Sequence, residues 1–169
     1  MALDRAQNPK QITNMKTKIE YCYGLLISGA SALQSPFLLL VRLYWGWQFI
    51  QTGLGKFRDL PKITEFFTTL GIPFPGLNAH FIATLELVGG SLLVLGLASR
   101  LIALPLTISM LVAYITADRE ALFSVISDPD KFYAAAPYTF LVASLIVLIF
   151  GPGRFSLDAW LAARPRRKL

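Results

Sequence analysis

Two ionisable side chains lie inside stretches of sequence that have the length and apolarity of membrane-spanning helices. Glu86 is near the middle of residues 79–99, and Arg42 lies within residues 36–55. A charged group at that depth is costly and is usually kept for a functional reason. A buried carboxylate can exchange a proton, and a buried cation can bind an anionic group. The sequence therefore indicates an integral membrane protein whose chemistry lies in a polar interior.

Polar residues near Glu86 predict a cluster around it. A rise of about 1.5 Å per residue places Gln48 and Gln51 closest to Glu86 in depth, so Arg42 would reach up to it and Lys56 down. The candidate members of this polar, ligand-binding cluster are Arg42, Gln48, Gln51, Lys56 and Glu86, with His80 near its outer edge. An alternative is that these groups only hydrogen-bond the helices together, which contributes about 0.6 kcal/mol per pair.

Glycines on two of the apolar segments predict how these segments pack. Gly46 and Gly53 share a helical face with Arg42, and Gly89 and Gly90 share one with Glu86. Small residues let two helix backbones approach closely. We therefore expect the first helix to pack antiparallel on the glycine stripe of the second.

The elements that must position these residues are apolar helices. The chain is 54% hydrophobic and only 15% charged, whereas soluble proteins have roughly 25% charged residues. Spans of about the ~20 residues that a bilayer requires are expected at about 36–55, 79–99, 101–117 and 132–151. The predicted fold class is all-α, a polytopic membrane four-helix bundle.

The remaining segments are expected to flank this bundle. Residues 1–35 contain a short apolar stretch, 21–34, which predicts an N-terminal interfacial or re-entrant helix. The first external loop carries an amphipathic pattern between Pro61 and Gly71, which predicts a short helix lying as a lid across the outer mouth of the bundle. The charged connection that starts at Asp118 shows no catalytic spacing and is interpreted as solvated. The membrane domain covers 36–160, and 161–169 form a basic tail.

Lysine and arginine outside the spans predict the orientation. Ten of them fall on the side of the two termini and five on the opposite side. Both termini should therefore be cytoplasmic in the cell (inner or plasma) membrane. The net charge of +6 is concentrated in the tails, where contact with anionic lipid is expected and nucleic-acid binding is not.

Cys22 is the only cysteine and His80 the only histidine. These counts exclude an intramolecular disulfide, a Cys-x-x-Cys pair, a structural zinc site and bis-histidine haem ligation by this chain. No metal site and no covalent cofactor are expected. Electrons, if the protein moves them, must be carried by a borrowed cofactor or by a partner.

Six features in order resemble the DoxX family over about residues 36–160. They are Arg42 within the first span, Gly55-Lys-Phe57, Gly71-Ile-Pro-Phe-Pro75, Glu86-Leu-Val-Gly-Gly90, Leu95-Gly-Leu-Ala-Ser-Arg100 and Gly151-Pro-Gly-Arg-Phe-Ser-Leu-Asp158. The resemblance implies a bacterial-type four-helix membrane protein, whose relatives include the DoxD subunit of a thiosulfate:quinone oxidoreductase and members of membrane oxidoreductase complexes. Arg42, Lys56, Glu86 and Arg100 are matching positions without an established catalytic role. The matching region has no cysteine, which argues against thiol-based sulfur transfer on this chain.

Two functions are favoured by these observations over a third, a small transporter, because the sequence shows no internal repeat and no second broken helix. The first is a membrane subunit of an oxidoreductase or electron-transfer system that holds a quinone or small donor, with Glu86 as proton acceptor and Arg42 or Lys56 binding the anionic form. The second is a non-catalytic accessory subunit of a larger membrane complex. Membrane lipids and other membrane or redox subunits are the expected partners in either case.

Overall fold

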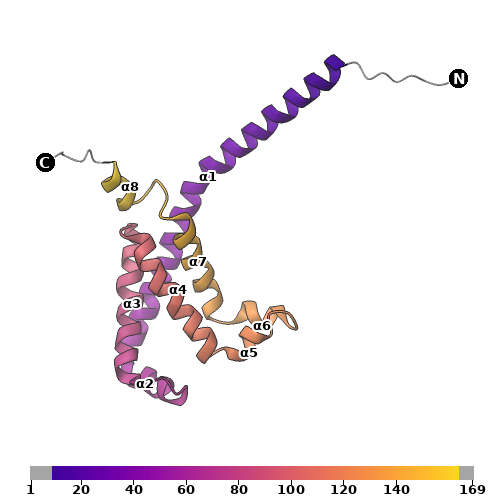
Figure 1. The fold of residues 1–169 in the computed structure, drawn as a ribbon. Helices are drawn as coiled ribbons and strands as arrows, with labels where there is room; N and C mark the ends of the chain where they lie inside the picture. The colour runs from indigo at the N-terminus through magenta and orange to yellow at the C-terminus, as the bar shows by residue number, and fades with distance from the viewer. Residues whose placement is uncertain (1–8, 164–169) are drawn as a thin grey trace. The chain divides into compact units, whose positions relative to one another are not determined.

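The structure is a computed structural model that describes residues 9–163, with side chains described from residue 20 onward. This part of the chain contains eight helices and no strand (Figure 1). The chain divides into two compact units, residues 1–34 and residues 35–169. The predicted all-α class is confirmed.

The first helix, α1 (Pro9–Arg58), runs through both of the segments that the sequence separated. Residues 21–34 and 36–55 form one continuous helix with Pro36 inside it, so the boundary expected near residue 35 is not a break in secondary structure. A proline removes only one backbone hydrogen bond, and apolar residues continue on both sides of it. In the first unit, the described side chains, 20–34, are all exposed.

The second unit contains the helices of the predicted bundle. Residues 35–58 of α1 are followed by α3 (Pro75–Leu95), α4 (Ser99–Thr116) and α7 (Pro137–Phe150). Their buried core consists of Phe49, Leu93, Ala103, Leu106, Met110 and Val147. Many other large apolar side chains face outward, as is usual for helices that meet lipid.

Within the described residues, three helices are long and apolar enough to cross a membrane: residues 20–58 of α1, α3 and α4. The fourth expected span, 132–151, is divided. α6 (Pro129–Ala134) ends where Ala135 is extended, and α7 begins with Pro137, which lacks a backbone N–H and suits a first helical turn. α7 therefore has 14 residues, a length of about 21 Å, and packs on α4.

Glycines allow α1 and α3 to approach each other closely. A Cβ at Gly53 would lie 2.6 Å from the backbone nitrogen of Leu87, and one at Gly90 would lie 2.5 Å from the carbonyl oxygen of Gly46. A Cβ at Gly89 would instead meet side chains of α4, at 3.1 Å from Leu106. The glycine stripe of α3 thus faces two neighbouring helices.

Short helices connect or follow the long ones. α2 (Leu60–Thr69) lies where the amphipathic pattern predicts a helix, is capped by the Asp59 carboxylate on the Lys62 N–H, and packs on α3. α5 (Arg119–Phe123) and α6 occupy the connection between α4 and α7. After α7, α8 (Leu157–Ala162) follows its N-cap residue Ser156, whose hydroxyl accepts a hydrogen bond from the Ala159 N–H.

Candidate functional site

A buried ion pair joins α1 to α3. Lys56, in the last turn of α1, donates to Glu86 with 2.5 Å between Nζ and Oε2. The Glu86 side chain is 4% exposed and that of Lys56 is 23% exposed. The close approach at Gly53, one turn before Lys56, brings the two helices near enough for this contact. A lysine near a helix C-terminus is also favoured by the helix dipole.

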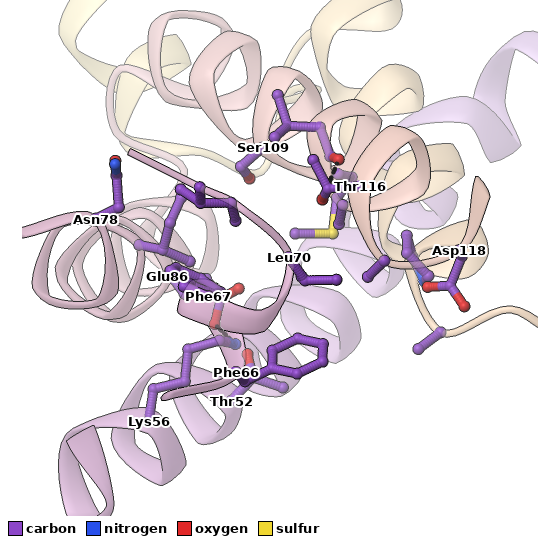
Figure 2. Close-up of a pocket in the computed structure, with 18 of the residues that line it drawn as sticks. Thr52, Lys56, Phe66, Phe67, Leu70, Asn78, Glu86, Ser109, Thr116 and Asp118 are labelled. Carbon is purple, nitrogen blue, oxygen red and sulfur yellow. Dashed lines mark hydrogen bonds and ion pairs between the residues drawn. The ribbon is translucent and has the colours of Figure 1, made fainter. Parts of the chain in front are cut away.

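The ion pair forms part of the wall of a cavity of about 390 Å³ (Figure 2). Most of the cavity lining is apolar and comes from α2, α4 and α7, including Phe66, Phe67, Leu70, Met110 and Phe140. Its other polar residues are Thr52, Asn78, Ser109, Thr116 and Asp118. α2, the predicted lid, therefore covers a space that holds a buried charge pair. Pockets that bind small ligands have this character, apolar with a few placed polar groups.

The structure places the other predicted cluster residues outside this ion pair. Gln48 is half-buried and Gln51 is exposed, and within the described residues neither hydrogen-bonds to Lys56 or Glu86. His80 is exposed, and its Nδ1 lies 2.8 Å from the carbonyl oxygen of Gly76, one turn earlier in the same helix. Of the six candidates, Lys56 and Glu86 are the two that meet.

Arg42 requires a correction, because it does not join the cluster around Glu86. It lies 14 residues before Lys56 on α1, which is about 21 Å along the axis. Its guanidinium is buried against Gly96 and donates from Nη2 to the carbonyl oxygen of Phe155, 2.5 Å away. Its hydrogen-bond partner, Phe155, belongs to the C-terminal segment. The expectation that the Arg42 side chain reaches toward Glu86 was therefore wrong.

Arg42 and Asp158 form a second polar site, near the start of α4. The sequence did not single out Asp158 as a site residue. Its carboxylate accepts hydrogen bonds from the backbone N–H groups of Ala98 (2.7 Å) and Ser99 (2.9 Å) at the start of α4. Its own N–H donates to the carbonyl oxygen of Gly96. Asp158 thus caps α4 from a distant part of the chain. Its negative charge also attracts the Arg42 guanidinium, whose Nε and Nη1 have no hydrogen-bond partner within the described residues. The sequence signal that could have indicated Asp158 is its place at the end of the Gly151–Asp158 motif.

Asp118 was also missed as a site residue. The sequence placed it in a solvated connection, whereas the structure places it in the cavity lining on the side away from Lys56 and Glu86 (Figure 2). In the residues that the structure describes, no group of three or more His, Cys, Asp and Glu side chains is arranged to hold a metal ion.

Together these features define a helical membrane protein with one polar site within its helices and a second at the start of α4. The sequence profile of the DoxX family matches residues 37–119, which include Arg42, Lys56 and Glu86. The chain belongs to the DoxX family.

Similar proteins come from three bacteria. The chain is 31% identical to "Putative oxidoreductase CatD" of Bacillus subtilis over 71% of this chain and 83% of that protein. It is 32% identical to "Uncharacterized membrane protein Rv3486" of Mycobacterium tuberculosis, over 76% and 83% of the two chains. An uncharacterized protein of Haemophilus influenzae is 30% identical, over 72% and 80%. No solved structure matches the chain significantly.

Proposed function

We propose that this protein is a membrane subunit of an oxidoreductase or electron-transfer system, and that it holds a quinone or a small electron donor in the cavity under α2. The observation that carries the proposal is the Lys56–Glu86 ion pair on the wall of an otherwise apolar cavity. The name of the B. subtilis relative, which contains the word oxidoreductase, supports the same class of activity.

The residues present fit a quinone head group. A volume of about 390 Å³ lies in the range of small-molecule sites. Phe66, Phe67 and Phe140 supply apolar and aromatic surface for a flat ring. Lys56 carries three N–H donors, of which one is used by Glu86, so that a ligand oxygen can accept another.

Each part of the site has a defined task in this proposal. A bound quinone would supply the capacity to carry two electrons and two protons. Lys56 binds a ligand oxygen, and Glu86, 4% exposed, holds or exchanges a proton beside it. α2 limits the access of water. Electrons pass between the bound molecule and a partner redox subunit. Arg42 takes no part because it lies 14 residues before Lys56 on α1, about 21 Å along the helix axis.

We also propose the location of the cavity. With both termini in the cytoplasm, as the positive-inside rule predicts, the C-terminal end of α1 and the N-terminal end of α3 face outward. The cavity then lies at the outer side of the cell membrane. Cysteine substitution at exposed Phe57 in a variant that lacks Cys22 tests this, since an impermeant maleimide should label intact cells.

A cavity-filling variant tests the proposed ligand. Wild-type protein is purified from native membranes in mild detergent, and extractable quinone is measured per mole of protein. Ala113→Trp fills the cavity from α4, and Leu111→Trp adds the same side chain at an exposed position of α4. Quinone should accompany the wild type and Leu111→Trp but not Ala113→Trp. Equal quinone in all three samples would contradict the proposal.

A second function, an accessory subunit without a ligand of its own, is favoured by the exposed apolar residues of the first unit. Tyr21, Tyr23, Leu26 and Leu33 are all more than 60% exposed, as is expected of a helix that meets lipid or another membrane subunit. Recovery of the protein in a large complex with no quinone of its own would favour this function.

A further inference from the structure

The polar lining of the cavity is rich in hydrogen-bond acceptors and poor in donors. Three hydroxyl groups line it, and each donates its only hydrogen to a backbone carbonyl of its own helix. Thr52 donates to Phe49 (3.0 Å), Ser109 to Leu106 (2.8 Å) and Thr116 to Val112 (2.8 Å). A hydroxyl has one hydrogen and two lone pairs. These groups can therefore offer a ligand only lone pairs.

The carboxylates of the lining have the same character. Glu86 uses Oε2 to accept from Lys56, and no hydrogen bond to Oε1 occurs within the described residues. In that part of the chain the Asp118 carboxylate accepts no hydrogen bond either, although Asp118 is the N-cap residue of α5. An ionised carboxylate only accepts. Both ends of the lining thus present acceptors to a bound molecule.

Few donors balance these acceptors. Lys56 supplies N–H groups beside Glu86. Asn78 donates one N–H to the carbonyl oxygen of Pro73, at 2.6 Å, which leaves its second N–H and its amide oxygen. Figure 2 shows both residues on the side of the cavity away from Asp118, with Leu70 and Phe66 between. Among the described lining residues, the Asp118 side therefore offers acceptors and no side-chain donor that is still free.

From this distribution we infer that the cavity selects the hydroxyl-bearing form of its ligand, a hydroquinone, over the corresponding quinone, and that Asp118 is the specificity-determining residue. The inference rests on the proposed function and names its substrate. A hydroquinone has an O–H at each end of a flat ring. One hydroxyl donates to Asp118, and the other oxygen meets Lys56 and Glu86.

A quinone cannot make the same contacts. Its oxygens only accept, so one carbonyl can be bound by Lys56 while the other faces the lone pairs of Asp118. Asp118 is half-buried, so a ligand in the cavity displaces water from its carboxylate. A polar group that loses water without gaining a partner costs about as much as a lost hydrogen bond, and more when the group is charged. The hydroquinone should therefore bind about tenfold more tightly or better.

Three ligands of one ring structure test this inference on the wild-type protein. The protein is reconstituted in lipid nanodiscs, and dissociation constants are measured for a short-chain hydroquinone, its quinone and the 1,4-dimethyl ether of the hydroquinone. Oxygen is excluded so that the hydroquinone stays reduced. The hydroquinone should bind at least about tenfold more tightly than either of the others, because only it has O–H donors.

Matched variants test the role of Asp118. Asp118→Asn keeps the size of the side chain and adds an N–H donor, so it should reduce the preference for hydroquinone by about tenfold, chiefly by improving quinone binding. Asp130→Asn makes the same change at an exposed residue of the same connection, outside the cavity lining, and should keep the wild-type preference.

The outcomes separate this inference from the proposed function. Equal binding of hydroquinone and quinone by the wild type, with both lost in Ala113→Trp, would overturn the preference and leave the cavity as the quinone site. An unchanged preference in Asp118→Asn would overturn the role of Asp118. If none of the three ligands binds to the wild type, the proposed function fails together with the inference.

Discussion

Lys56 Nζ and Glu86 Oε2 are 2.5 Å apart, although 30 positions separate the two residues in the sequence. The contact ties the last turn of α1 to the middle of α3, and both residues line the cavity. A buried ion pair is weak evidence for stability, because desolvation of both charges offsets their attraction. Its position on the wall of a cavity is the observation on which the proposed functional role rests.

Breaking the pair from one side should be more harmful than replacing both residues. Lys56→Met leaves Glu86 buried without its cation and should lower the free energy of unfolding by about 3 kcal/mol. Lys56→Met combined with Glu86→Leu removes both charges and should recover most of that loss. Thermal unfolding of the purified variants in detergent measures both effects. A double variant at least as unstable as Lys56→Met alone would contradict this account.

Gly53 and Gly55 form a matched pair for the packing of α1 on α3. A Cβ at Gly53 would lie 2.6 Å from a backbone nitrogen of α3, whereas a Cβ at Gly55 would meet nothing within 4 Å. Gly53→Ala should therefore destabilise the protein by about 1–3 kcal/mol. Gly55→Ala should be neutral or stabilise it by up to about 1 kcal/mol, since alanine favours helix. Equal effects of the two substitutions on thermal unfolding would show that the helices do not approach closely at Gly53.

The capping of α4 by Asp158 should hold the C-terminal segment in place. Asp158→Ala removes two hydrogen bonds to the first turn of α4 and should cost about 1–2 kcal/mol. Limited proteolysis should then cut near residues 151–158 at protease concentrations that leave the wild type intact. Asp130→Ala, an exposed residue in another connection, serves as the control. Wild-type resistance in Asp158→Ala would contradict the capping role.

The exposed pair of Glu120 and Lys131 predicts a local pH dependence. Lys131 Nζ lies 2.9 Å from Glu120 Oε2, and this hydrogen bond, with the charge of Lys131, lowers the pKa of Glu120 below its ordinary value of 4.5. The contact therefore stabilises the connection above that ordinary value and is lost as the pH falls through the lowered pKa. The same contact raises the pKa of Lys131, so its contribution is also lost as the pH rises through that raised value.

Carbon-13 NMR of labelled glutamate checks this prediction. Glu120 should titrate at a higher pH in Lys131→Ala than in the wild type, and high salt should narrow the difference. At neutral pH the signal of Glu65, which is exposed on α2, should be the same in both proteins. An unchanged Glu120 titration would show that the pair does not form in solution.

The sequence predicts those features of the fold and of the site that depend on neighbouring residues in the chain. Helical periodicity and the glycines indicate helices at the right places, and Lys56 and Glu86 could be named because each is polar in an apolar context. The partners of Arg42 could not be named in this way. They lie in the C-terminal segment, and periodicity within a helix does not show where a distant segment returns.

Asp118 and α7 illustrate the same limit. Asp118 is followed by Arg119 and Glu120, a pattern typical of a solvated connection, and its place in the cavity depends on how α4 ends beside α2. The start of α7 depends on an extended Ala135 followed by Pro137. A search for apolar spans of about 20 residues joins the segments on either side of this break, because both are apolar.

Photoaffinity labelling tests the central claim, that the cavity under α2 holds a quinone-type ligand, most directly. A quinone that carries an aryl azide is irradiated with the reconstituted protein, and the labelled residues are identified by mass spectrometry. The account predicts labels on Phe66, Phe67 or Met110 that unlabelled ligand displaces and that Ala113→Trp abolishes. Labels confined to lipid-facing residues such as Leu111, unchanged by competitor and by Ala113→Trp, would contradict it.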